Sequence, residues 1–197
     1  TSLDETNDVS IAGPIAGGRD QSGAFTAETF VHFFIIYNPT TQDVSSLSSA
    51  TATPAALPSG YTFYRRVGSV YFDALSHLRV CNQLDNEIFV DAAAGLVFSS
   101  QAPSLADTWE SVDISTKIPA TAKTVRGKVG ANAGTGSKTM GVGVDDDEFM
   151  VSFFVFTAPS YGFSWNFPVL TAQTLWWRAS TTDAHYYLIV TSYLDDL

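Results

Sequence analysis

The feature that most limits the fold of this chain is the shortness of its apolar runs. The longest, Phe30–Tyr37 and Phe149–Phe156, are soon followed by proline or polar residues. No apolar period of 3.6 residues persists through three turns, whereas short runs with this punctuation are typical of β-strands. Aromatic residues, which fit pleated sheets better than helices, make up 13% of the chain. The sequence therefore predicts an all-β protein.

The spacing of the strand candidates predicts the kind of β-structure. Phe30–Tyr37 is apolar almost throughout and ends at Asn38-Pro39, as expected of a central strand covered on both faces. About ten short strands without helices favour an antiparallel β-sandwich of jelly-roll type with long loops. The Gly-rich segment 127–143 is typical of flexible strands or of a long loop. The other strand candidates are Tyr61–Phe72, Leu78–Cys81, Glu87–Val90, Gly95–Ser99, Trp109–Ser115, Phe149–Phe156, Tyr161–Phe167, Thr174–Ser180 and His185–Tyr193.

By composition the chain has two parts. Residues 1–21 are small, polar and Gly-rich, which is typical of an extended N-terminal arm that reaches a neighbour. Residues 22–197 are enough for one sizeable sandwich, and the overall hydrophobic content of 45% provides for a core. We therefore predict an arm over 1–21 and a single β-sandwich domain over 22–197, which folds without a cofactor.

The charge of the chain bears on its partners. Twenty acidic and ten basic side chains give a formal net charge of −10, which repels phosphate backbones and anionic lipid surfaces. The apolar runs are also too short to span a bilayer. Nucleic acid and membrane are therefore not expected as partners. Cys81 is the only cysteine, so the chain has no internal disulfide, and we interpret Cys81 as a small buried residue.

Catalytic patterns are missing from the sequence. It has no G-x-S-x-G elbow, and His32 stands inside an apolar strand, where a hydrogen-bonded core histidine is the expected interpretation. The acidic run 145–148 lacks the alternate spacing of a calcium loop and favours a solvated turn over a metal site. A glycosidase pair of distant carboxylates stays open at this level. We predict no enzyme activity, no metal and no cofactor.

The last two strand candidates suggest a contact surface. With a turn at 181–184, Thr174–Ser180 and His185–Tyr193 form a predicted hairpin. One predicted face, apolar enough for the core, carries Leu175, Trp177, Ala179, Tyr186, Leu188 and Val190. The opposite face is rich in aromatic residues beside an arginine, a composition typical of contact sites, and it carries Trp176, Arg178, Tyr187 and Ile189. We expect this second face to meet a neighbouring subunit or a host glycan.

A motif in the first half of the chain resembles a known family. Residues 57–69 read Leu-Pro-Ser-Gly-Tyr-Thr-Phe-Tyr-Arg-Arg-Val-Gly-Ser, which is similar to the pattern L-P-x-G-Y-x-x-x-R-R-x-G-S of the C-terminal domain family of bacteriophage tail fibres and related phage virion surface proteins. The flanking segments 18–20, 29–39, 112–119, 173–180 and 193–195 follow the family's pattern in order. Phe30-Val31 and Ser192-Tyr193 depart from it, where Trp-Tyr and Gly-Trp are usual.

The motif also has a direct physical interpretation. Pro58-Ser59-Gly60 suits a tight turn with Gly60 at positive φ, and Tyr61 starts the following strand towards Gly68. Arg65 and Arg66 face opposite ways in a strand, so we expect one to be buried against a carboxylate and the other to be exposed.

The resemblance implies a virion location and a structural role. It implies a homotrimer that contacts other virion proteins, displayed as a tail fibre or tail appendage domain that contacts the host cell. Only a short arm precedes the predicted domain, which keeps a capsid decoration protein as an alternative. A free carbohydrate-binding module and a polysaccharide-degrading tail enzyme are the alternatives from other functional classes.

Overall fold

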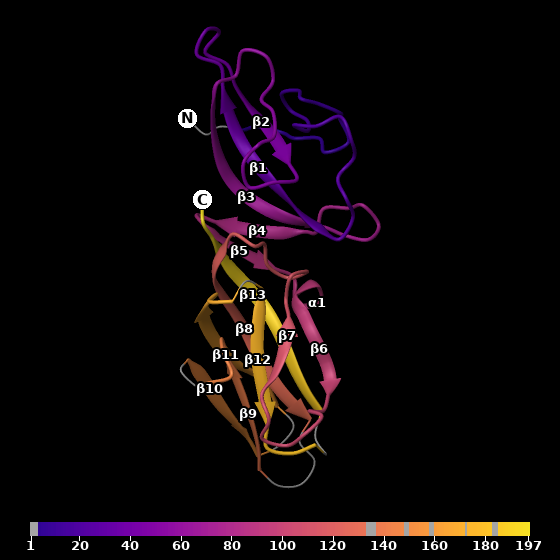
Figure 1. Ribbon diagram of the computed structural model, residues 1–197, viewed down its shortest axis with the longest axis vertical. Coiled ribbons are helices and arrows are strands. Elements are labelled where there is room, and N and C mark those ends of the chain that lie inside the picture. The colour runs from indigo at the N-terminus through magenta and orange to yellow at the C-terminus, as the bar shows by residue number, and fades with distance from the viewer. Residues whose placement is uncertain (1–3, 133–136, 148–149, 158–159, 172, 183–184) are drawn as a thin grey trace. The chain divides into compact units, whose positions relative to one another are not determined.

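The computed structural model describes residues 4–132, 137–147, 150–157, 160–171, 173–182 and 185–197. In these residues the strands run antiparallel to their neighbours within each sheet, and the helical structure is a single four-residue turn, α1 (Ala92–Gly95). The predicted all-β class is therefore confirmed (Figure 1).

The chain forms two compact units, where the sequence predicted an arm and one domain. Unit 1 comprises Thr1–Arg79 together with Leu197, and unit 2 comprises Val80–Asp196. The boundary thus falls among residues that the sequence assigned to a single sandwich. Short polar stretches separate many strands of this chain, so composition did not distinguish a boundary between units from an ordinary loop.

Unit 1 is built on a three-stranded sheet in the order β2-β1-β3. Its strands are β1 (Thr29–Tyr37), β2 (Val44–Ser49) and β3 (Phe63–Phe72). Val31 on one face of β1 is buried, and so are Phe34 and Ile36 on the other. The prediction of a central strand covered on both faces is confirmed, because an apolar run without alternation suits a strand with no solvated side.

The N-terminal segment is not an extended arm, so that prediction is wrong. Its backbone folds back along β2: Gly17 N donates to Ser46 O (2.8 Å), Asp20 N donates to Ser48 O (2.8 Å) and Ser48 N donates to Gly18 O (2.9 Å). Strand β2 is the edge of its sheet, and an edge presents unpaired backbone groups. The small residues of this segment allow the close backbone approach that satisfies them.

Unit 2 contains two larger sheets. One has the strand order β10-β9-β12-β7, and the other has the order β11-β8-β13-β5-β4, with β6 pairing to β13. The strands are β4 (Cys81–Leu84), β5 (Glu87–Val90), β6 (Leu96–Gln101), β7 (Glu110–Asp113), β8 (Ala122–Asn132), β9 (Lys138–Gly143), β10 (Val151–Phe156), β11 (Ser160–Pro168), β12 (Thr174–Ala179) and β13 (His185–Asp195).

The two sheets of unit 2 pack face to face through aromatic side chains. The ring of Trp177 on β12 lies 4.7 Å from that of Phe98 on β6 and 6.1 Å from that of Tyr186 on β13, measured between centroids. All three side chains are buried. The arrangement is an antiparallel sandwich, and the jelly-roll connectivity stays a prediction.

The Gly-rich segment 127–143 forms parts of two strands, β8 and β9, where its residues are described. Gly127 shows why glycine is used: a Cβ there would collide with the carbonyl oxygen of Ile189 and with the indole of Trp165. The glycines thus allow strands and large rings to approach closely.

The hairpin predicted from the last two strands is wrong in its pairing. Strand β12 pairs with β7 and β9, whereas β13 pairs with β5, β6 and β8. The two strands lie in different sheets and meet through their side chains, as the contact of Trp177 with Tyr186 shows. The predicted core face is confirmed, since each of its six residues is at most 1% exposed.

Candidate ligand-binding site on the outer face of a sheet

The candidate site is built on one cross-strand row of the four-stranded sheet. In this row Phe153 of β10 pairs with Gly141 of β9, and Gly141 pairs with Arg178 of β12. The neighbours of Arg178 along β12, Trp177 and Ala179, are both buried in the core. Because successive side chains of a strand face opposite ways, Arg178 and Phe153 lie on the outer face of the sandwich.

Two aromatic rings hold the guanidinium of Arg178. Its central carbon lies 4.9 Å from the ring centroid of Phe153 and 5.1 Å from that of Trp109, which precedes β7. The two rings are themselves 6.3 Å apart. A cation over the face of a ring is attracted by the ring quadrupole, so this long side chain is kept in a defined position.

Gly141 makes this arrangement possible. A Cβ at Gly141 would lie 2.9 Å from Phe153 Cε1 and 3.0 Å from Trp109 Cη2, which is tighter than normal packing allows. The missing side chain leaves a flat floor across which the aromatic rings and the arginine converge. A glycine of the Gly-rich strand β9 thus leaves room for these side chains on the outer surface of the sheet.

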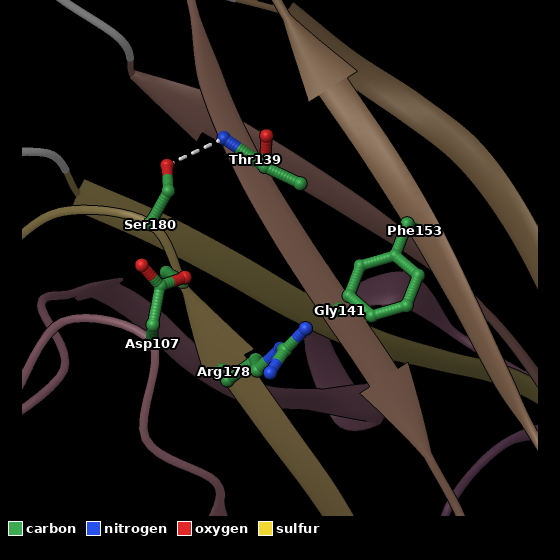
Figure 2. A pocket seen from close by; sticks show the side chains of 7 residues that line it. Asp107, Thr139, Gly141, Phe153, Arg178 and Ser180 are labelled. Carbon is green, nitrogen blue, oxygen red and sulfur yellow. Dashed lines mark hydrogen bonds between the residues drawn. The ribbon is translucent and has the colours of Figure 1, made fainter. Parts of the chain in front are cut away.

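The row borders a pocket of about 340 Å³. Figure 2 shows Asp107 and Ser180 on one side of it, Phe153 on the other, and Arg178 between them. Thr139 and Ala179 complete the lining. The pocket thus combines one carboxylate, one guanidinium, two hydroxyls and one aromatic ring.

Backbone hydrogen bonds fix the polar side of the pocket. Asp107 N donates to Ala179 O (2.8 Å) and Ser180 N donates to Thr139 O (2.9 Å), while Thr139 N donates to Ser180 Oγ (2.9 Å; Figure 2). Asp107 adopts φ 57°, in the left-handed region that Asp tolerates better than most residues. The backbone of Asp107 is therefore fixed against that of Ala179 at the end of β12.

The four predicted contact residues are half-buried, and the structure divides them between two surfaces. Trp176 and Arg178 lie on the outer face of β12, whereas Tyr187 and Ile189 lie on the outer face of β13 in the opposing sheet. The single contact face predicted for them is wrong, because the two strands are not paired. Only Arg178 of the four lines the pocket.

The resemblance motif lies in unit 1, whereas the residues of this pocket belong to unit 2. Tyr61 N donates to Pro58 O (3.1 Å) across Gly60, which has φ 86°, so the predicted tight turn is confirmed. Gly68 is buried, and Tyr61 packs against the cluster of Phe34, Ile36 and Leu47. The described contacts of Gly60 and Tyr61 therefore form a turn and part of the core of unit 1.

The two arginines of the motif differ in exposure, although neither is buried as one was predicted to be. Arg65 is exposed and Arg66 is half-buried. The contacts of the Arg66 guanidinium include Ser69 Oγ (3.2 Å) and His32 Nδ1 (3.5 Å), where the sequence predicted a carboxylate. His32 is buried and contacts Ser69 Oγ, which confirms its interpretation as a hydrogen-bonded core histidine.

The comparisons with other proteins give no family. The sequence matches no family model, and neither the curated proteins nor the solved structures compared with it give a match. The candidate site therefore depends on its own chemistry.

Other potential sites offer less. Among the described residues, no three His, Cys, Asp or Glu side chains are grouped so that they could hold a metal ion, and Glu148 of the acidic run lies outside them. Cys81 is half-buried, and burial raises the pKa of its thiol, which lowers its reactivity. No helix in the described parts of the chain has the length and hydropathy needed to cross a membrane.

Sequence reasoning missed most of the pocket residues. Asp107, Thr139, Gly141, Phe153 and Ser180 come from four separate segments, and the alternation of their own strands does not show which strands are neighbours. The available signal was indirect: Gly141 interrupts a strand, and glycine in a strand often marks the close approach of another group. The register of β9 with β10 and β12 was the missing information.

Proposed function

We propose that this protein is a bacteriophage virion structural protein, displayed on the particle surface as a tail fibre or tail appendage domain, which binds the host cell and is not an enzyme. The observation that carries the binding role is the Arg178 pocket, where aromatic rings hold a cation opposite a carboxylate. Side chains of this kind are enriched where proteins contact their partners. The rigid sheet beneath them keeps such a surface in place.

The virion location depends on the resemblance of residues 57–69 to phage surface proteins. The segments 18–20, 29–39 and 57–69 lie in unit 1, whereas 112–119, 173–180 and 193–195 lie in unit 2. Within unit 2, Gln173 Nε2 donates to Ile118 O (2.7 Å) and Ile114 N donates to Gln173 O (2.8 Å). The matching segments are thus spread over both units, and two that are distant in sequence meet within unit 2.

The same proposal includes a homotrimer as the working form. Its support is the resemblance of residues 57–69 to phage surface proteins. Light scattering at micromolar concentration tests this part, and a monomer in solution and on the particle contradicts it.

Immunogold electron microscopy of intact particles tests the location. Antibodies against the chain are expected to label the tail; labelling of the head assigns the protein to capsid decoration, and unlabelled particles overturn the virion assignment.

An adsorption assay tests the binding role. Excess wild-type protein is expected to compete with particles for host cells, whereas Arg178→Ala competes poorly and Lys128→Ala, a charge-matched change at an exposed site on the other sheet, competes normally.

A further inference from the structure

We infer that the Arg178 pocket takes an uncharged sugar ring, with its apolar face against Phe153 and its hydroxyls between Asp107 and Arg178. This inference rests on the proposed function, since it names the chemical class that the host-binding site recognises. It assigns binding roles to Asp107, Phe153 and Ser180, which line the pocket together with Arg178.

The hydrogen-bonding groups of the pocket match a polyhydroxyl ligand. An ionised carboxylate only accepts hydrogen bonds and a guanidinium only donates them, whereas a hydroxyl does both. Asp107 and Arg178 border the same pocket (Figure 2). Neighbouring hydroxyls of one sugar ring can therefore donate to Asp107 and accept from Arg178, and Ser180 and Thr139 add two hydroxyls of either role.

The aromatic side of the pocket matches the carbon face of such a ring. Phe153 is 46% exposed although it is large and apolar, and it stands on β10, the edge strand of its sheet. A sugar ring carries C–H groups on its faces and hydroxyls around its rim. Placing a face on Phe153 removes apolar surface from water, while the rim stays within reach of the polar groups.

The charges of the pocket disfavour other ligand classes. An anionic ligand would be repelled by the Asp107 carboxylate and by a chain of net charge −10. A cationic ligand would be repelled by the Arg178 guanidinium. A wholly apolar ligand would strip water from both charged groups without replacing their hydrogen bonds, which is costly. An uncharged ligand rich in hydroxyls avoids all three penalties.

The size and rigidity of the pocket suit a small part of a glycan. Its volume of about 340 Å³ lies at the small end of ligand pockets, which suits one or two rings. The guanidinium of Arg178 is held by the rings of Trp109 and Phe153. Side chains that are already placed lose little conformational entropy on binding.

The test is titration calorimetry with the whole chain and three probes: neutral methyl hexosides, a hexuronic acid and a hexosamine. We expect neutral hexosides to bind and the acid and the amine to bind more weakly. Asp107→Asn keeps a residue that tolerates positive φ but removes the charge, and hydrogen bonds to charged groups contribute enough that about a tenfold loss of affinity is expected. Phe153→Ala is expected to lower the affinity for neutral hexosides by a similar factor.

Two matched variants serve as controls. Phe89→Ala removes a strand aromatic of similar exposure (41%) from the other sheet, and Asp146→Asn removes an exposed acid elsewhere in unit 2. Both are expected to bind like wild type. Preference for the acid or the amine overturns the inference, and so does an equal loss in the controls. If no sugar binds while Arg178→Ala still fails to compete for host cells, the ligand class is wrong and the proposed function stands; if Arg178→Ala competes normally, the proposed function fails.

Discussion

The imidazole of His32 on β1 lies 2.8 Å from the hydroxyl of Ser69 on β3, and the two residues are direct partners in the β1–β3 ladder. Arg66 joins them by donating to Ser69 Oγ. Residues three apart in a regular strand face opposite ways, but the ladder register shifts between Phe33, which pairs with Gly68, and Phe34, which pairs with Arg66. This bulge turns Arg66 and Ser69 to the same face of the sheet.

Replacing Ser69 with alanine tests how much this cluster contributes to the stability of the fold. Both His32 and Ser69 are buried, so the substitution removes a partner that water does not replace. Losing an intramolecular hydrogen bond costs about 0.5–1.5 kcal/mol, and His32 Nδ1 keeps its contact with Arg66. Urea denaturation, with hydrogen exchange of the β1 and β3 amides to assign the loss to unit 1, measures the effect. Ser59→Ala, at an exposed site, serves as the control, and equal stability of the two variants contradicts the role of the cluster.

The turn at Gly60 gives a second prediction. Gly60 has φ 86°, and a Cβ there would lie 2.6 Å from Asn38 Nδ2. Asn38 is buried, and its Oδ1 accepts from the backbone of Thr40 (3.0 Å), so it has little freedom to move. Left-handed backbone alone costs a non-glycine residue about 1–2 kcal/mol, and the contact with Asn38 adds to this in Gly60→Ala.

The control for Gly60 is Gly23→Ala. A Cβ at Gly23 meets only Gln21 Nε2, at 4.0 Å, so this variant is expected to stay within about 0.5 kcal/mol of wild type. Chemical denaturation of both variants in parallel measures the difference. If Gly60→Ala unfolds at the same urea concentration as Gly23→Ala, the turn does not require positive φ.

Asp73 predicts a pH dependence in the loop after β3. Its carboxylate accepts from the backbone N–H groups of His77 and Leu75, both at 2.9 Å. The hydrogen bond from His77, assisted by the one from Leu75, holds the pKa of Asp73 below its usual 3.8. A lowered folded-state pKa stabilises the fold at pH values above the unfolded-state pKa, and this contribution is lost as the pH falls through the folded-state pKa.

Asp73→Asn isolates this effect. The free energy of unfolding of wild type is expected to exceed that of the variant at neutral pH, and the difference is expected to shrink as the pH falls below 3.8. Urea denaturation across this range measures it. Asp146→Asn controls for the loss of one exposed negative charge, and a difference that stays constant with pH contradicts the assignment.

The sequence predicted the buried faces of strands and the positions of turns better than it predicted which strands pair. The alternation of β12 and β13 identified Trp177 and Tyr186 as core residues, and Gly60 identified a turn, because side-chain direction and local backbone angles depend on nearby residues. It failed where partners come from distant segments. The turn at 181–184 made β12 and β13 appear to be a hairpin, whereas β12 pairs with β7 and β9. The pocket was missed for the same reason.

Adjacent tryptophans on β12 provide the last prediction. Trp177 is 1% exposed and packs against Phe98 and Tyr186, whereas Trp176 is half-buried on the outer face, in the row of Gly143 and Ser111. Truncating a buried tryptophan removes core contacts and leaves a cavity, which costs about 3–5 kcal/mol. We expect Trp177→Ala to destabilise unit 2 by this amount and Trp176→Ala to cost about 1 kcal/mol, the usual size for a site that is not fully buried.

The functional effects of the two substitutions should run in the opposite order. Trp176→Ala leaves the core intact but changes the outer face beside Arg178, so it is expected to weaken assembly or competition for host cells while unit 2 stays folded. Hydrogen exchange of the β12 amides reports folding, and light scattering with the adsorption assay reports the surface. If Trp176→Ala unfolds unit 2 as readily as Trp177→Ala, Trp176 belongs to the core and the outer face of β12 has been misassigned. If it leaves both assembly and adsorption unchanged, the contact surface does not extend along β12 from Arg178 to Trp176.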